Sequence, residues 1–175
     1  MKKKIKKIIG IILIILALIA LGVFTYFFLK ETDADKFRKE YNTLEISENN
    51  PVVYTTDATI LGHLSKGDKL VFLGKPSSKK TISVIETLLK VLSDNGIEKI
   101  YYYNLESGSK ETVKLVQNKI DNVTFDDSTL ILVKNDNIEK YYINEKEDLN
   151  KDDRKELYAA YEDIILSYIM CSSKC

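Results

Sequence analysis

The chain has 175 residues and carries 26 basic and 26 acidic side chains, so its formal net charge at pH 7 is zero. Five of the lysines precede residue 8, and without them 21 basic side chains face 26 acidic ones, a net charge of −5. This mildly acidic balance, without aromatic residues interleaved among basic ones, argues against a nucleic-acid-binding surface.

A long apolar segment follows the N-terminal lysines. The run Ile8–Leu29 has 22 residues and no charged side chain, and as a helix it would be about 33 Å long, enough to cross a bilayer. Because basic flanks stay in the cytoplasm, the sequence predicts a cytoplasmic basic tail over 1–7, a single transmembrane helix in contact with lipid over 8–29, and a C-terminal domain outside the cell membrane. A cleaved signal peptide is the alternative, although its apolar core is usually shorter and no A-x-A-like site lies near the end of the run.

Residues 30–50 are predicted to form a juxtamembrane helix and a connector. Apolar residues at helical spacing predict a helix over Asp33–Leu44; they are Phe37, Tyr41 and Leu44. The polar residues that follow are typical of a connector. We expect one folded domain over residues 51–175, as its length allows.

Strands and helices alternate along this domain. Apolar runs predict five strands: Val52–Tyr54, Lys69–Gly74, Ile100–Tyr103, Thr129–Val133 and Ile138–Ile143. Periodicity and capping residues predict helices from Asp57 to about Lys66, from Ser78 to Asn95, from Ser109 to Ile120 and after Asn150. The segment Asn135-Asp136-Asn137 is typical of a hairpin turn. This order predicts an α/β fold with a mixed central sheet flanked by helices, and it matches the thioredoxin fold.

One segment carries a resemblance to a known family. Residues Leu70–Thr81, LVFLGKPSSKKT, resemble the strand, loop and helix start of membrane-anchored thioredoxin-like proteins of the bacteriocin transport accessory type. In that family an apolar strand leads into G-x-P-T-C-P-x-C, which opens a long helix, and the lead-in here is Gly74-Lys75-Pro76-Ser77. The resemblance implies that Ser78 and Thr81 occupy the positions of the two redox cysteines, as a degenerate redox site.

The departure from the family pattern removes its chemistry. Thiol–disulfide exchange needs a thiolate with a lowered pKa, which Ser78 and Thr81 cannot supply. The only histidine, His63, is expected on another helix, so a serine nucleophile would lack a base. Ser128 stands where the family usually has a cis-proline. The sequence therefore predicts no catalytic residue, no cofactor and no metal site, and Ser77 or Ser78 is expected to cap the long helix instead.

The loss of the cysteines need not remove a groove that the family uses for extended substrates. By the resemblance, this groove lies between the start of the long helix and the strand near Ser128, where substrates pair through their backbones. The candidate binding residues are Lys75, Pro76, Ser77, Lys79, Lys80 and Ser128. The lysines and the free helix amides could instead receive an anion or a peptide carboxylate, or simply form a solvated face. Asp126 is expected beside them, neutralising Lys79 or Lys80.

These observations predict a membrane-tethered, redox-inactive module that binds a protein or peptide partner outside the cell membrane. Two cysteines at the chain end, Cys171 and Cys175, leave an alternative open, because disulfides persist in that compartment. Residues at i and i+4 of a regular helix do not point at each other, so a disulfide between them requires the helix to unwind after Met170. They could also be free thiols, an intermolecular bridge or a displaced redox pair. The last of these gives the alternative function, a thiol–disulfide oxidoreductase or accessory factor.

Overall fold

A computed structural model describes residues 12, 14–23, 25, 31–120 and 124–172, with the side chains of 171 and 172 outside the description. The chain divides into two compact units, Met1–Thr32 and Asp33–Cys175. The predicted membrane span Ile8–Leu29 lies partly outside the described residues, and its described residues are helical. Within the described part of the chain, no helix is both long and apolar enough to span a membrane.

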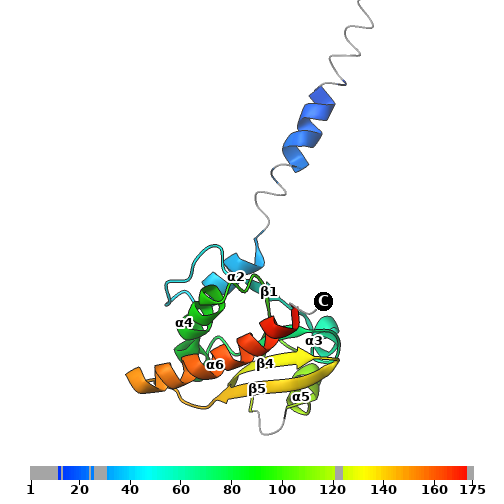
Figure 1. Cartoon of the computed structure of the whole chain (residues 1–175). Helices are drawn as coiled ribbons and strands as arrows, with labels where there is room; N and C mark the ends of the chain where they lie inside the picture. The colour runs from blue at the N-terminus through cyan, green and yellow to red at the C-terminus, as the bar shows by residue number, and fades with distance from the viewer. Residues whose placement is uncertain (1–11, 13, 24, 26–30, 121–123, 173–175) are drawn as a thin grey trace, which may run out of the picture. The chain divides into compact units, whose positions relative to one another are not determined.

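The second unit is built on one five-stranded sheet with the order β1-β3-β2-β4-β5 (Figure 1). Its strands are β1 (Val52–Tyr54), β2 (Lys69–Gly74), β3 (Ile100–Asn104), β4 (Ser128–Lys134) and β5 (Asn137–Asn144). The first three are mutually parallel, whereas β4 runs antiparallel to β2 and β5 antiparallel to β4. The predicted α/β fold with a mixed central sheet is therefore confirmed.

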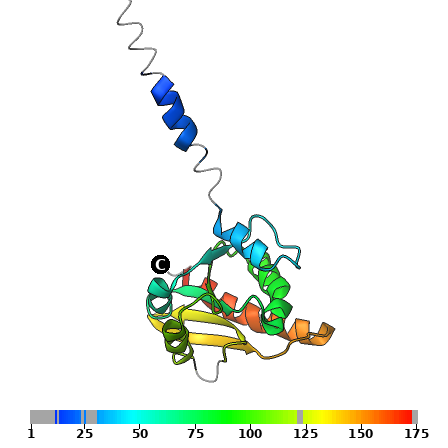
Figure 2. The same cartoon turned by 180° about the vertical axis from the view of Figure 1, so that it is seen from behind.

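Five helices in the described part of this unit pack on the two faces of the sheet, as Figures 1 and 2 show. They are α2 (Asp33–Glu40), α3 (Asp57–His63), α4 (Lys79–Asp94), α5 (Lys110–Gln117) and α6 (Lys151–Ser172). Helices α2, α4 and α6 share one apolar core with the sheet, and α3 and α5 share the other. The result is a three-layer sandwich, the arrangement expected when parallel strands are joined by helical crossovers.

Successive side chains of a strand point to opposite faces of the sheet, so neighbouring residues belong to different cores. Phe72 of β2 belongs to the core under α4 and α6, and its neighbour Leu73 belongs to the core under α3 and α5. Successive tyrosines of β3 divide in the same way, with Tyr102 in the first core and Tyr103 in the second. Each of these four side chains is at least 98% buried, because a strand in the middle of a covered sheet has no solvent face.

Local capping and turn chemistry sets several boundaries as predicted. Ser109 Oγ accepts a hydrogen bond from the amide of Thr112 at 3.2 Å and caps α5. Asn150 Oδ1 accepts the amide of Asp152 at 2.8 Å at the start of α6. Asn135 and Asp136 have φ of 49° and 64°, the left-handed values that a tight hairpin between β4 and β5 requires.

The helix predicted over Asp33–Leu44 is shorter and more deeply packed than the sequence indicated. Helix α2 ends at Glu40, and Phe37 and Tyr41 are almost fully buried in the core beneath α4 and α6. The ring centroids of Phe37 and Tyr102 lie 5.0 Å apart in an edge-on arrangement. The sequence placed residues 30–50 before the domain, but α2 packs within the same compact unit as the sheet.

Candidate functional site

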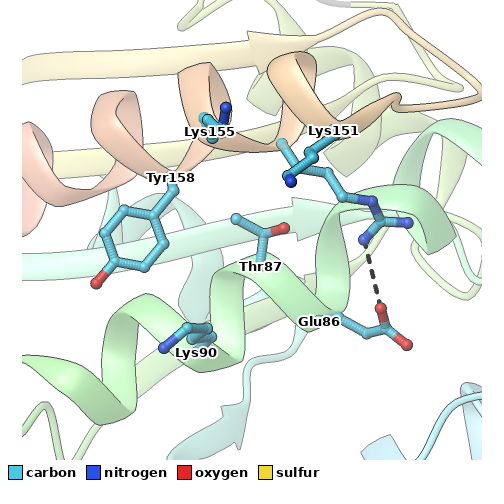
Figure 3. A pocket seen from close by; sticks show the side chains of 7 residues that line it. Glu86, Thr87, Lys90, Lys151, Lys155 and Tyr158 are labelled. Atoms are coloured by element: carbon cyan, nitrogen blue, oxygen red, sulfur yellow. Dashed lines mark hydrogen bonds and ion pairs between the residues drawn. The ribbon is translucent and has the colours of Figure 1, made fainter.

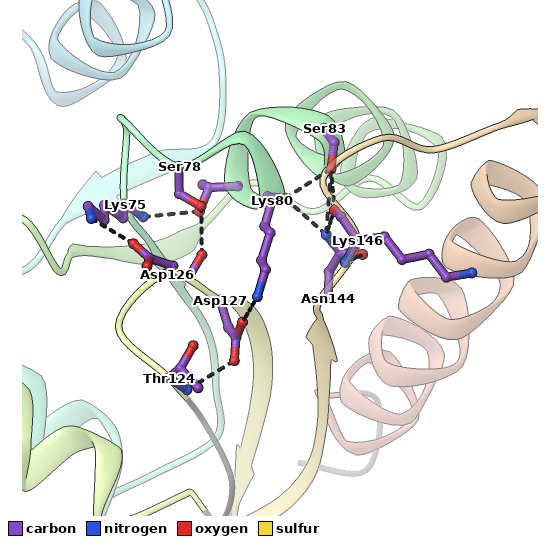
Figure 4. Close-up of polar contacts among 10 residues, drawn as sticks. Lys75, Ser78, Lys80, Ser83, Thr124, Asp126, Asp127, Asn144 and Lys146 are labelled. Atoms are coloured by element: carbon purple, nitrogen blue, oxygen red, sulfur yellow. Dashed lines mark hydrogen bonds and ion pairs between the residues drawn. The ribbon is translucent and has the colours of Figure 1, made fainter.

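An open pocket of about 500 Å³ lies at the start of α4, where β2 leads into that helix. Its walls come from the β2–α4 loop, the first turn of α4, the segment before β4 and the segment after β5. It is lined by Lys75, Ser77, Ser78, Lys79, Lys80, Thr124, Asp126 and Glu147. Four of the six residues predicted for binding therefore line one pocket, together with Ser78, which was predicted to belong to a degenerate redox site. Figure 4 shows the polar contacts at this place.

Ser78 holds the N-cap position of α4 but does not act as the predicted helix cap. Its backbone is extended, and its side chain accepts no hydrogen bond from the helix amides. Instead, Ser78 Oγ donates to the carbonyl oxygen of Asp126 at 2.7 Å (Figure 4). The hydroxyl is used as a donor that joins α4 to the segment before β4, and the residue is only 8% exposed. The expectation that it satisfies a free helix amide is wrong, because a closer acceptor from another segment faces it.

The hydrogen bond from Ser78 to Asp126 predicts the effects of two substitutions at Ser78. Ser78→Ala is expected to lower the free energy of unfolding by about 1–2 kcal/mol, since it leaves the Asp126 carbonyl without its donor. Ser78→Asp should be at least as damaging, because a carboxylate cannot donate to that carbonyl, although aspartate is among the best N-cap residues. Urea unfolding followed by circular dichroism measures both. An aspartate variant more stable than the parent would mean that the helix dipole outweighs the contact with Asp126.

Thr81, the second position of the predicted degenerate redox site, is fully buried and does not line the pocket. Its Oγ1 accepts a hydrogen bond from the backbone amide of Lys75 at 3.1 Å, which closes the loop between β2 and α4. A Cβ atom added at Gly74 would lie 2.8 Å from the Thr81 methyl group. Gly74 therefore allows the strand end and the helix start to pack closely, and Thr81 has a structural role.

Two lysines of the site are held by carboxylates from the segment before β4. Lys75 Nζ lies 2.6 Å from Asp126 Oδ1 and 4.5 Å from the ring centroid of Phe125. Lys80 Nζ lies 2.7 Å from Asp127 Oδ1. The prediction that Asp126 neutralises Lys79 or Lys80 is wrong: Asp126 pairs with Lys75, and its neighbour holds Lys80.

Asp127 is the most constrained ionised group of the site. It is 1% exposed, and its second carboxylate oxygen accepts the amide of Thr124 at 3.0 Å. Burial alone would raise its pKa, but the hydrogen bonds from Lys80 and Thr124 outweigh burial and hold the pKa of Asp127 below its usual range. The same pair raises the pKa of Lys80. Asp127 and Lys80 thus form a largely buried ion pair that joins the first turn of α4 to the segment before β4.

Lys79 is the one lysine of the three that projects freely into water. Its side chain is 72% exposed, and its nearest carboxylate, Glu147, is 3.9 Å away. The side chains of Lys75 and Lys80 are only 21% and 23% exposed. An exposed cluster of three lysines is therefore not what the structure has, and carboxylates already neutralise the two inner cations. The first turn of α4 offers little net positive charge to an anion.

Asn144, which the sequence did not single out, ties the end of β5 to the site. Its side-chain amide donates to the carbonyl of Lys80 at 3.0 Å and to that of Lys146 at 2.8 Å. It is 3% exposed and pairs across the sheet with Ser128. Asparagine at a strand end often bonds to nearby backbone, but the 64-residue separation from Lys80 hides this contact from a local pattern.

The remaining predicted binding residues lie at different depths. Ser77 is exposed in the pocket wall, and its backbone amide donates to Glu106 Oε2 at 3.3 Å; Pro76 is half-buried beside it. Ser128 opens β4 but is fully buried, and its hydroxyl has no hydrogen-bond partner among the described residues. Ser128 does not line the pocket, so a partner could reach only the segment in front of it.

His63 is not available to Ser78 as a base. It ends α3, on the opposite face of the sheet from α4, and its ring stacks on Tyr101 with the centroids 4.0 Å apart. Burial, together with Lys69 and Lys99, lowers the pKa of His63. Among the described residues, no group of histidine, cysteine, aspartate and glutamate side chains could hold a metal ion.

The C-terminal cysteines are only partly within the described chain. Helix α6 continues through Ser172, so the backbone does not unwind directly after Met170, as a local disulfide was expected to require. The side chain of Cys171 and the whole of Cys175 lie outside the described residues. Their pairing therefore stays a prediction.

No protein-family model and no curated protein matches this sequence. The pocket combines one exposed cation, Lys79, with two cations that carboxylates neutralise, Lys75 and Lys80.

Proposed function

We propose that this chain is a membrane-tethered, redox-inactive thioredoxin-like module that binds a protein or peptide partner outside the cell membrane. The observation that carries the proposal is the open pocket at the start of α4, which has Ser77 and Lys79 on its rim and Ser78 in its wall. In the family that Leu70–Thr81 resembles, this place holds the redox cysteines and receives extended substrates.

The arrangement of the sheet supports the thioredoxin-like part of the proposal. Three parallel strands joined by α3 and α4, with α5 leading to an antiparallel hairpin and a final helix, follow the element order of that fold. The strand order also places the start of β4 directly beside the end of β2. This neighbourhood is the one in which the family's redox site and its cis-proline meet, and here it holds Ser78 and Ser128.

The polar contacts of the site support binding without redox chemistry. The hydroxyls at the two positions that hold cysteines in that family both form hydrogen bonds with the backbone. Ser78 Oγ donates to the carbonyl of Asp126, and Thr81 Oγ1 accepts from the amide of Lys75. The Lys80–Asp127 pair and Asn144 fix the surrounding segments. A rigid, internally satisfied pocket loses little conformational freedom when a partner binds, which favours affinity.

The proposed location rests on charge and hydropathy. Ile8–Leu29 is long enough to span a bilayer, and five lysines precede it. The bias of lysines toward the N-terminal side supports a cytoplasmic N-terminus, with the unit Asp33–Cys175 outside. The pocket would then meet partners at the outer surface of the cell membrane.

Engineered cysteines test the location and the pocket together. In cells expressing the full chain with Cys171→Ser and Cys175→Ser, Ser77→Cys is expected to react with a membrane-impermeant maleimide that carries a benzophenone. Illumination should then join the chain to a partner. Lys114→Cys is a matched control, because Lys114 is exposed on α5, on the opposite face of the sheet from α4. It should be labelled equally but give no adduct.

The labelling result tests the location, and the cross-linking result tests the pocket, so either can fail without the other. Labelling only after lysis would place the domain in the cytoplasm and contradict the location. Equal labelling with no adduct from Ser77→Cys, or with the same adducts from both positions, would contradict a binding role for the pocket. An adduct specific to Ser77→Cys that disappears with Lys79→Glu would support the pocket most strongly.

A further inference from the structure

A second concave surface lies between α4 and α6, away from the start of α4. This α4–α6 groove has a volume of about 580 Å³ (Figure 3). Its floor contains Thr87 and the ring of Tyr158, and its rim carries the basic side chains Lys90, Lys151, Arg154 and Lys155. Glu86 is the only acidic residue in its lining. A surface with this balance favours an acidic occupant over a neutral or basic one.

The rim cations are accessible to an occupant. The side chains of Lys90, Arg154 and Lys155 are 65%, 44% and 67% exposed. Each has one carboxylate near it, respectively Asp94 at 2.7 Å, Glu86 at 3.4 Å and Asp152 at 2.9 Å. Exposed pairs of this kind contribute little to stability, so they exchange readily for a carboxylate of a partner.

Lys151 adds a positive charge at the N-terminus of α6, a position that is unfavourable for a cation. It is the first residue of α6, where the helix dipole favours negative charge. It is exposed and forms no ion pair with any residue that the structure describes. Its unpaired charge therefore remains available at the rim.

Tyr158 gives the groove a fixed apolar floor. Its hydroxyl donates to Asp94 Oδ2 at 2.7 Å, and Lys90 Nζ lies 5.8 Å from its ring centroid. Figure 3 shows the ring of Tyr158 between α6 and α4, and the hydroxyl contact with Asp94 holds it there. A side chain with an apolar stem, such as glutamate, can pack its methylene groups on this ring while its carboxylate reaches a rim cation.

We propose that the α4–α6 groove binds an acidic peptide segment of a protein partner. A membrane surface fits the geometry less well, because the apolar floor lies between two helices, where a flat bilayer cannot reach it. The proposal does not depend on the pocket at the start of α4, since the two sets of lining residues have no member in common.

The test measures binding of a fluorescent oligoglutamate peptide to the full chain in non-ionic detergent, by anisotropy. Lys151→Glu with Lys155→Glu is expected to weaken binding about tenfold or more. Glu86→Gln should strengthen it severalfold, because it removes the acidic residue of the lining. Glutamate at the first position of α6 suits the helix dipole, so the charge-reversed variant is expected to remain folded, which circular dichroism verifies.

The matched control is Lys110→Glu with Lys114→Glu in α5. Both lysines are exposed and have the same spacing as Lys151 and Lys155, and Lys110 is the first residue of its helix, as Lys151 is. They lie on the opposite face of the sheet. The N-terminal lysines are present in every variant, so their attraction for the peptide cancels. Equal losses in control and groove variants, or no peptide binding at all, would overturn the proposal. Groove-dependent binding of glycerol phosphate, a soluble lipid headgroup, without peptide binding would also overturn it.

Discussion

Replacing Asp127 with alanine is expected to lower the free energy of unfolding by about 2–4 kcal/mol, because it leaves the partly buried ammonium of Lys80 without its counterion. The lost carboxylate accepts hydrogen bonds from Lys80 at 2.7 Å and from the Thr124 amide at 3.0 Å. Equilibrium urea unfolding of the full chain in non-ionic detergent measures the effect. Tyrosine fluorescence is a suitable signal, since the chain has 11 tyrosines and no tryptophan.

Asp126→Ala is the control for this experiment. Asp126 is the adjacent residue and also pairs with a lysine, but its side chain is 60% exposed. Its loss should cost less than about 1 kcal/mol, as for other exposed pairs. Similar losses from both substitutions would show that burial of Asp127 contributes nothing to the strength of its pair.

The contribution of Asp127 should also depend on pH in a defined direction. Its pKa is lower in the folded chain than in the unfolded chain, so its stabilisation is present above the unfolded pKa, about 3.9. That stabilisation is lost as the pH falls through the folded pKa. The difference in stability between the parent and Asp127→Ala should therefore be constant near neutral pH and shrink in acid below about pH 4. A difference that grows in acid would contradict this sign.

Phe37→Ala is expected to lower the free energy of unfolding by about 3–5 kcal/mol, the range for deleting a buried aromatic ring. Phe37 is fully buried and packs against Tyr41 and Tyr102, with ring centroids at 4.7 and 5.0 Å. The same unfolding experiment measures this loss. It tests whether α2 is part of the folded unit or a spacer between the apolar N-terminal segment and the domain.

Leu115→Ala is the control for the loss of apolar surface. Leu115 is 50% exposed on α5, so its truncation should change stability by no more than about 0.5 kcal/mol. If Phe37→Ala were equally mild, α2 would not be an integral part of the core. The residues before Val52 would then serve only as a connector.

Elements whose signals lie within a few residues of each other could be predicted from the sequence. The apolar run Lys69–Gly74 predicts β2 with its observed bounds, because a strand covered on both faces has no polar alternation. Ser109 and Asn150 mark helix starts, since a capping side chain bonds amides two or three residues ahead. Asn135 and Asp136 mark the hairpin, because they tolerate positive φ.

Contacts between side chains that are distant in sequence depend on tertiary packing. Ser78 was predicted to cap α4, but folding brings the Asp126 carbonyl, 48 residues away in sequence, within reach of its hydroxyl. Lys80 was expected beside Asp126, but folding brings the carboxylate of Asp127, 47 residues away in sequence, to its ammonium group instead. The burial of Phe37 and the groove between α4 and α6 likewise depend on the packing of segments that are distant in sequence. Capping, turns and periodicity act over one or two turns of chain, whereas ion pairs, grooves and cores depend on side chains that only the packed sheet and helices bring together.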